Sequence, residues 1–313
     1  MIPKLYRHIL LGLALGLATL TAHALPQPRQ ISPHTWAWVG PYEAPDKANQ
    51  GFRMNLGFVI GSEAVAVIDS GYTPDMARAM LQQIRARTPL PVRYVINTNS
   101  QPHRFMGNEA FRQAGARIVA ATEAAERMHN EGVAFATGIA RILELPAAPP
   151  VPEAPDLLID TGGSETLELG GGVTLSVEHY GRTHTRGTLV VYVEPDQTVY
   201  TGDIVYGGRL LAILPDSHVG DWIAAFERLQ TLRAKQCVPG HGTPGSLADF
   251  EHATYAYLSA LKTHMDQAVE NGTGVADAMA DFDAQPWREL ANFDELAGRN
   301  ASLAYLEREA ESF

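Results

Sequence analysis

The sequence of 313 residues contains one cysteine and no long apolar run beyond residue 24. A single cysteine excludes an intramolecular disulfide. Cys237 stands in the apolar run Gln236–Val238, which is typical of a small core residue. A catalytic thiol at this position is the less favoured alternative. Without a second apolar run of about 20 residues, we expect no membrane span in the rest of the chain.

Basic residues are also scarce. Lys and Arg number 24 against 35 Asp and Glu, a formal charge of −11. No basic patch with interleaved aromatic residues is present, so we do not expect nucleic acid as a partner. The apolar share of 45% is ample for a buried core, in one large domain or two small ones.

The first 24 residues have the pattern of a cleavable secretory signal peptide. Lys4 and Arg7 give a positive start, Ile9–Leu20 is apolar, and Ala22–Ala24 is a small-x-small cleavage pattern. Cleavage before Leu25 predicts a periplasmic protein with 22 basic and 35 acidic residues, a formal charge of −13. An uncleaved N-terminal anchor is the alternative.

Apolar and alternating runs predict two β-rich halves, each followed by helices. The expected strands are Thr35–Val39, Phe52–Ile60, Ala64–Ile68, Val92–Ile96, Arg117–Ala120, Glu165–Leu169, Val173–Glu178, Thr188–Val193, Thr198–Tyr200 and Cys237–Val238. The expected helices are one that begins at Thr73-Pro74, then Asn108–Gln113, Thr122–Asn130, Asp221–Arg233, Leu247–Val269 and Asn300–Glu311. A proline-rich surface connection, Ala147–Pro155, separates the halves. This order predicts an α/β fold with mixed sheets.

Several loops that follow apolar strands carry residues suited to metal chemistry. They are Asp69 after Ile68, the loop Asn97–Asn108 with Asn99, Gln101, His103 and Arg104, then His184 within Gly181–Gly187, Asp203 after Gly202, and His241 within Pro239–Gly242. Imidazole and carboxylate groups are common ligands of transition metals. Because the ends of several strands can converge on one cleft, we expect these loops to form a single site.

This ordered set resembles the metallo-β-lactamase superfamily from residue 25 to about Pro244. The family motif N-T-H-x-H-x-D-H-x-x-G-N corresponds to Asn97–Asn108, and its H-T-x-G, G-D and G-H-G motifs correspond to His184, Asp203 and His241. The resemblance implies an αββα sandwich over residues 25–245, with a C-terminal helical extension over 246–313 packed on it. The C-terminal stretch also resembles the tail of periplasmic quinoprotein relay system zinc metallohydrolases, which implies a partner in such a system.

The resemblance implies two zinc positions. In this chain the first motif, Asn97–Asn108, lacks the family's usual ligands for both of them. Asn99 and Gln101 stand where the first zinc has two histidines, and neutral amides are weak zinc ligands, so this zinc is expected to be absent. The second position keeps Asp203 and His241, with His103 in place of the motif's Asp and Arg104 in place of its last His. The mono-zinc, carbapenem-hydrolysing subclass likewise has Asn first and Arg last, but it retains the middle His and the Asp.

Two functions remain open at this stage. One is a hydrolase of a small carbonyl, ester, thioester or lactam-type substrate, with at most one zinc on His103, Asp203 and His241 and with His184 beside it as a ligand or base. Arg104 would dock a substrate carboxylate, and His184, Asn99 or Gln101 would donate to an oxyanion. The other is a catalytically inactive binding or accessory protein, in which Arg104 replaces the metal charge beside Asp203. A scaffold role has no supporting feature.

Overall fold

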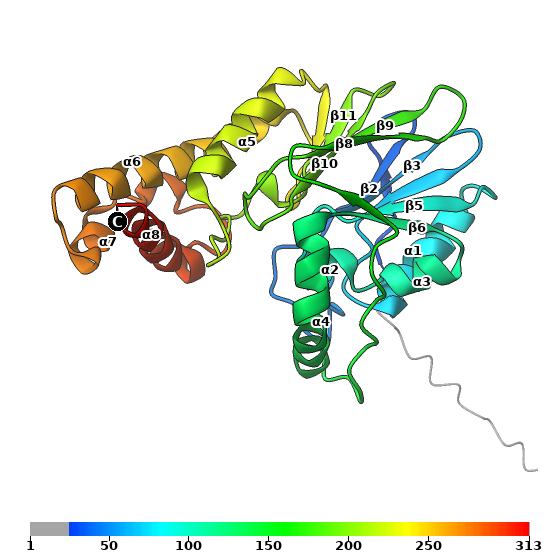
Figure 1. Ribbon diagram of the computed structural model, residues 1–313, viewed down its shortest axis with the longest axis horizontal. Helices are drawn as coiled ribbons and strands as arrows, with labels where there is room; N and C mark the ends of the chain where they lie inside the picture. Colours follow the sequence, from blue (N-terminus) through cyan, green and yellow to red (C-terminus); the bar gives the residue numbers. More distant parts are fainter. Residues whose placement is uncertain (1–24, 313) are drawn as a thin grey trace, which may run out of the picture.

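The strands assemble into two mixed sheets that pack face to face, with helices outside them (Figure 1). The computed structural model describes residues 25–312, so the expected signal peptide lies outside the described residues. The predicted αββα sandwich is confirmed. Among the described residues, no helix combines the length and apolar character that crossing a membrane requires.

The larger sheet has seven strands in sequence order. They are β1 (Arg29–Gln30), β2 (Thr35–Trp38), β3 (Leu56–Ile60), β4 (Val65–Ile68), β5 (Val92–Ile96), β6 (Arg117–Ala121) and β7 (Leu157–Ile159). Strands β1 to β4 pair antiparallel, and β4 to β7 pair parallel. In β4 all four residues are buried, as expected for a strand covered on both faces.

The smaller sheet has five strands in the order β12-β11-β10-β9-β8. They are β8 (Ser164–Glu168), β9 (Thr174–His179), β10 (Leu189–Val193), β11 (Thr198–Tyr200) and β12 (Gln236–Val238). Only β11 and β12 pair parallel. Cys237 in β12 is fully buried, and burial raises the pKa of its thiol, in keeping with a core residue.

Helices on the outer faces bury their apolar stripes on the sheets. They are α1 (Pro74–Arg85), α2 (Pro102–Phe105), α3 (Asn108–Gln113), α4 (Thr122–Ile142) and α5 (Val219–Thr231). Helix α1 begins as predicted, because the Thr73 hydroxyl accepts from the Met76 amide at 3.1 Å and Pro74 is at the first helical position. Helix α4 continues twelve residues beyond the predicted Asn130.

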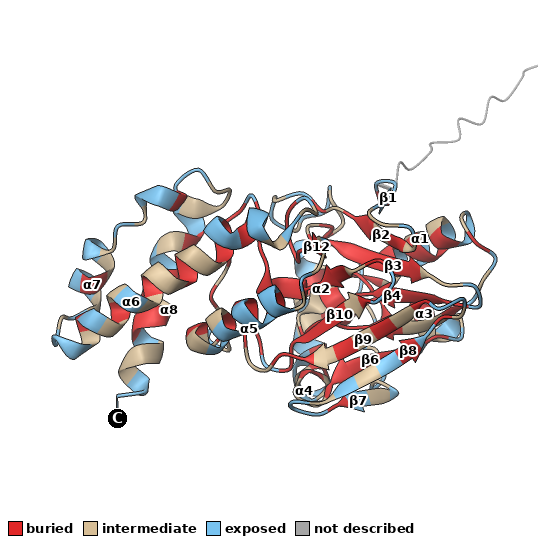
Figure 2. Cartoon of the chain, turned by 90° about the horizontal axis from the view of Figure 1, so that it is seen from above, coloured by how far each residue is buried: buried red, intermediate tan, exposed pale blue. Residues whose placement is uncertain are grey.

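The chain ends in three further helices, α6 (Tyr257–Glu270), α7 (Val275–Asp281) and α8 (Phe293–Ala310), which project from the sandwich in Figure 1. A 3-10 turn over Leu247–Phe250 and a π-helical segment over Glu251–Ala256 replace the start of the helix predicted from Leu247. Helices α5, α6 and α8 share one buried cluster, which includes Trp222, Tyr257 and Tyr305. Figure 2 shows this buried stripe on their inner sides and exposed residues outside. The boundary at residue 245 stays a prediction.

One predicted strand is too long at its start. Strand β3 begins at Leu56 and not at Phe52. The reason lies in Asn55, whose amide N–H donates to the carbonyl of Gly240 at 2.9 Å. Its side chain also donates to the carbonyls of Pro239 and Gly242, at 2.8 and 2.7 Å. Asn55 is therefore bound to the turn that carries His241 and not to a neighbouring strand.

Candidate functional site

The predicted site residues meet where strands of both sheets end. Asp69 follows β4, the loop after β5 carries the degenerate motif, and Asp203 lies in a short 3-10 turn after β11. His241 lies in the turn after β12, and His184 in the connection between β9 and β10. These positions bring residues more than 170 positions apart in the sequence into one buried polar cluster. The convergence of these loops was predicted from their places after the strands.

The two asparagines that frame the motif hold its loop closed. The side-chain amide of Asn97 donates to Asn108 at 3.0 Å, and that of Asn108 donates back to Asn97 at 2.7 Å. Asn97 also donates to the backbone carbonyl of Arg104 at 2.9 Å. The frame therefore has a structural role that is independent of what the loop binds.

Arg104 lies at the centre of the cluster, and its side chain is 1% exposed. Its Nε and Nη2 donate to the two oxygens of Asp203, at 3.2 and 2.5 Å. Its Nη1 donates to Asp69 at 3.0 Å and to the carbonyl of Asn55 at 2.8 Å, and Nη2 also donates to the carbonyl of Gly240 at 3.3 Å. A guanidinium has five N–H groups, so every donor of Arg104 has an acceptor.

Asp203 is the matching acceptor. Besides the two contacts from Arg104, its Oδ2 accepts from the side-chain amide of Asn99 at 2.8 Å. Gly240 allows the His241 turn to approach this closely, because a Cβ at Gly240 would overlap the Asp203 carboxylate. Burial alone would raise the pKa of Asp203, but the charge of Arg104 holds it well below its usual range. Asp203 is therefore ionised and paired.

Asp69 is the second carboxylate that shares Arg104. It adopts a left-handed backbone conformation, with φ of 61°, and accepts from the amide and hydroxyl of Thr98, at 2.7 Å and 2.9 Å. Burial raises its pKa to about 6, against the opposing effects of Arg104 and Thr98. Asp69 therefore orients the motif loop and the guanidinium together.

Three histidines surround this ion pair and are nearly closed off from solvent. Burial lowers the pKa of His103 and of His184 to about 4 and that of His241 to about 3, although the charge of Asp203 acts in the opposite direction. All three are therefore neutral at pH 7. The rings of His184 and Trp222 lie 5.3 Å apart, and the ring of Tyr206 stacks on His241 at 5.0 Å.

Two of these imidazoles have a buried nitrogen without a hydrogen-bond partner among the described residues, Nε2 of His103 and Nδ1 of His184. His241 has a different feature. Its Nδ1 lies 3.0 Å from the carbonyl of Arg53, which can only accept, so Nδ1 carries the proton. Its Nε2 then carries a lone pair and lies 3.3 Å from Asp203 Oδ1, which can only accept as well, so these two atoms form no hydrogen bond. A carbonyl partner on the far ring nitrogen is common in metal-binding histidines.

A metal ion can be tested against these positions. Ligand atoms of His103, Asp203 and His241 lie within 4.8 Å of one another, so three donors of the right type converge. The guanidinium of Arg104, however, contacts both oxygens of Asp203 and carries a fixed positive charge. A divalent ion bonded to Asp203 at about 2 Å would lie beside that charge. The arrangement therefore fits Arg104 and does not fit a zinc ion on Asp203.

The structure changes the roles expected for individual residues. Arg104 was expected to dock a substrate carboxylate, but all its N–H groups face the interior, so this expectation is corrected. Gln101 is half-buried, and its backbone N–H donates to the side-chain oxygen of Asn99 at 2.8 Å. His184 does not belong to the group of three converging donors. Asn55 and Tyr206 also contact the site, but they have no distinctive spacing in the sequence and were not predicted.

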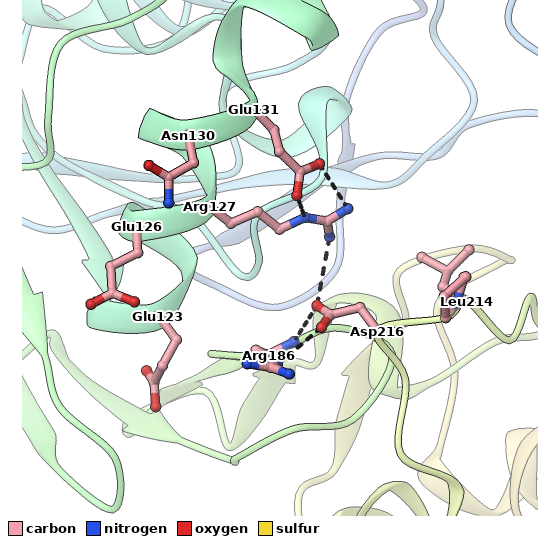
Figure 3. A pocket seen from close by; sticks show the side chains of 9 residues that line it. Glu123, Glu126, Arg127, Asn130, Glu131, Arg186, Leu214 and Asp216 are labelled. Atoms are coloured by element: carbon pink, nitrogen blue, oxygen red, sulfur yellow. Dashed lines mark hydrogen bonds and ion pairs between the residues drawn. The ribbon is translucent and has the colours of Figure 1, made fainter. Parts of the chain in front are cut away.

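A cavity lies near this cluster. It measures about 560 Å³ and is lined by residues of α4 and of the loops near Arg186 and Asp216. Figure 3 shows Asp216 between Arg127 and Arg186, with ion-pair distances of 3.8 and 3.0 Å, and Glu131 pairs with Arg127 from the other side. Arg127 also reaches Ser100 of the motif loop at 3.4 Å. The cavity therefore adjoins the motif loop, and both of its arginines are already paired.

Comparisons with known proteins agree on the family. The model of the "Metallo-beta-lactamase superfamily" matches residues 51–241. The acyl-coenzyme A thioesterase MBLAC2 of Gallus gallus is 27% identical over 210 residues, which cover 61% of this chain and 73% of that protein. The same-named protein of Homo sapiens is 31% identical over 91 residues, 28% of this chain and 31% of its own length.

Solved structures show the same fold. A metallo-β-lactamase from Pontibacter korlensis has a TM-score of 0.59 at 22% identity, covering 74% of this chain and 98% of its own. The metallo-β-lactamase DIM-1 has a TM-score of 0.59 at 16% identity, covering 75% and 98%. At these identities the likeness extends to the fold and not to the chemistry.

Proposed function

This chain belongs to the metallo-β-lactamase superfamily of hydrolase-fold proteins, and we propose that it is a metal-free member that binds a small molecule without hydrolysing it. The observation that carries the proposal is the pairing of Arg104 with Asp203, in which the guanidinium contacts both carboxylate oxygens. A guanidinium in this place supplies the positive charge that a cation would otherwise supply to Asp203.

The energetics support this assignment. Removing Arg104 from Asp203 to make room for a metal would leave five buried N–H groups and two buried carboxylates to be paired again. Breaking a buried ion pair costs about 3–5 kcal/mol before any new interaction forms. The histidines are also packed under Tyr206 and Trp222, which leaves His184 2% and His241 4% exposed. A water bound at these two histidines would therefore have little contact with solvent.

A second candidate is a single-metal hydrolase of a thioester or a similar carbonyl compound. It is favoured by the lone pair that His241 directs into the cluster and by the unpartnered Nε2 of His103. It is also favoured by the relative from Gallus gallus, which is named as an acyl-coenzyme A thioesterase. This candidate requires Arg104 to leave Asp203, so we place it second.

Turnover after zinc loading separates the two candidates. The purified chain would be incubated with zinc and assayed with an acyl-coenzyme A thioester and a chromogenic lactam, beside a His241→Ala variant. We expect the same background rate from both proteins, since no metal-bound water forms. Hydrolysis that chelator abolishes and that His241→Ala removes would establish the hydrolase instead.

Location and partners are further parts of the proposal. The sequence of the first 24 residues supports export to a periplasm through a cleaved signal peptide. The C-terminal likeness supports a partner in a quinoprotein-dependent oxidation system, by analogy alone. Cell fractionation with sequencing of the mature N-terminus tests the first point, and a start at Leu25 is the expected result.

A further inference from the structure

The loop after Asp203 covers the histidine cluster. Its residues 206–213, the Tyr206 loop, carry the ring that stacks on His241, with ring centres 5.0 Å apart. The same ring meets that of His184 edge-on at 6.0 Å, and Tyr206 is 2% exposed. On this side, therefore, a molecule can reach the two imidazoles only when the Tyr206 ring moves away.

Thr254 holds the backbone of Tyr206 from the C-terminal extension, which the structure describes over residues 246–312. Thr254 lies in the π-helical segment Glu251–Ala256 and is fully buried. Its hydroxyl accepts from the amide of Tyr206 and donates to the carbonyl of the same residue, each at 2.9 Å. A hydroxyl can donate and accept at once, so one side chain fixes both backbone groups. π-helical turns are rare, and they often occur at functional sites.

Asn300 on α8 holds the far end of the Tyr206 loop. Its Oδ1 accepts from the amide of Ile213 at 2.8 Å. Its Nδ2 donates to the carbonyl of Leu211 at 2.8 Å and to the hydroxyl of Tyr257 at 3.1 Å. Asn300 is fully buried, and a buried amide costs free energy unless its hydrogen bonds are made. These contacts therefore hold the loop and the helix in one relative position.

The middle of the Tyr206 loop is tied to the turn before α8. The amide of Leu210 donates to the carbonyl of Ala291 at 2.9 Å, and the amide of Ala291 donates to the carbonyl of Gly208 at 3.1 Å. A further backbone hydrogen bond runs to the sandwich, from the amide of Gly207 to the carbonyl of His241 at 2.9 Å. The extension therefore holds the loop at its start, middle and end, and the turn under the ring holds it at Gly207.

Apolar packing alone does not fix this arrangement. The loop also packs on the extension through buried apolar side chains, among them Leu210 and Leu211. Such contacts are non-directional. Thr254 and Asn300 add hydrogen bonds of defined geometry to the loop backbone. Without either side chain, buried backbone groups of the loop would lack partners, and this favours a displaced loop.

We propose that the C-terminal extension controls access to the histidine cluster, with Thr254 and Asn300 as positioning residues that keep the Tyr206 ring on His241. In the observed position of the extension the ring closes the cluster, and release of the Tyr206 loop opens it. This control of access rests on the proposed function, in which a small molecule has to reach the cluster. Access can be measured without a metal or a ligand, so the two proposals can fail separately.

Modification of histidines by diethyl pyrocarbonate, located by peptide mass spectrometry, measures access to His241 in the full chain. The reagent attacks an unprotonated imidazole nitrogen, which Nε2 of His241 provides. We expect His241 to react slowly in the native chain and about tenfold faster or more in Thr254→Val, which loses two hydrogen bonds at the same side-chain shape. Thr254→Ser keeps the hydroxyl and should restore the slow reaction. The exposed His129 on α4 is the internal standard for the reagent.

The matched control is Thr35→Val, which makes the same substitution at another fully buried threonine. The Thr35 hydroxyl donates to Asp196 at 2.6 Å, in the turn between β10 and β11, so this variant reports a general loss of stability. Asn300→Leu releases the far end of the loop and keeps the test valid if Thr254→Val does not fold. The proposal is overturned if His241 reacts at the native rate in either folded loop variant, or if Thr35→Val accelerates it equally.

Discussion

The guanidinium of Arg104 and those of Arg53 and Arg209 lie on two sides of the same turn, and they differ in how they are satisfied. Arg104 donates all five N–H groups to fixed acceptors, among them two carboxylates. Arg209 is almost as buried but makes one long hydrogen bond within the described part of the chain. A saturated buried cation is compensated by its partners, whereas an unsaturated one keeps the cost of burial.

This contrast separates two regions around the His241 turn. The inner region, around Asp69, Arg104 and Asp203, is a closed ion-pair network. The outer region, around Arg53 and Arg209, retains unused hydrogen-bonding capacity. Substitutions that break the inner network or change its charge, while the outer pair stays intact, test this contrast.

The largest effect is expected from restoring the family motif. Combining Asn99→His, Gln101→His, His103→Asp and Arg104→His removes the guanidinium, adds three imidazoles and replaces the imidazole of His103 with a carboxylate. We expect zinc binding with a dissociation constant of about 1 µM or tighter, which is a standard binding free energy of about −8 kcal/mol or lower. Zinc titration by calorimetry measures it. Failure of the folded variant to bind zinc would mean that the downstream residues no longer form a metal site.

Removing Arg104 alone should destabilise the fold strongly. Arg104→Met leaves Asp69 and Asp203 buried without a counter-ion, so we expect the free energy of unfolding to fall by about 3–5 kcal/mol. Urea denaturation provides the measurement. Arg78→Met is the control, because the exposed pair of Arg78 with Asp75 should contribute less than about 1 kcal/mol. Equal losses for the two variants would contradict a buried, saturated network.

The inner histidines predict a smaller dependence of stability on pH. Their pKa values are lowered to about 4, 4 and 3, so below pH 6.5 the unfolded chain takes up protons that the folded chain refuses, and stability falls. Asp69, with a pKa raised to about 6, acts oppositely, since its folded form binds the proton first as the pH falls. Near pH 5 three histidines act against one aspartate, which gives a net loss of about 2.7 kcal/mol per pH unit.

His103→Gln removes one of the three histidines and should reduce this slope by about 1.4 kcal/mol per pH unit. Denaturation midpoints between pH 6.5 and 4.5 measure both slopes. A stability that stays constant over this range would show that the histidines are hydrated or protonated, and the inner region would then not be the dry network described here.

Much of the site could be predicted from the order of residues along the chain. Asp69, Asp203 and His241 stand directly after apolar strands, and parallel pairing of β4 with β5 and of β11 with β12 brings those strand ends together. The direction in which the Arg104 side chain points could not be predicted from the sequence. It depends on acceptors such as the Asn55 carbonyl, 49 positions earlier in the chain.

Other features have no local signal. Arg53 and Arg209 are single arginines in loops, and only their burial and lack of partners distinguish them. The length of α4 was underestimated, because Gly132 and Gly138 weaken the helical pattern. In the structure Gly132 is buried against Val151 of the proline-rich connection, where a Cβ would overlap that side chain. Tertiary packing therefore compensates for the low helix propensity of glycine.

The zinc content of the native chain after loading tests the central claim most directly. The purified protein would be incubated with excess zinc, freed of unbound metal and analysed by mass spectrometry for metal per chain, beside His241→Ala. If Arg104 supplies the charge at Asp203, both proteins should retain the same background of far less than one zinc per chain. About one zinc per chain in the native protein, lost in His241→Ala, would contradict the account.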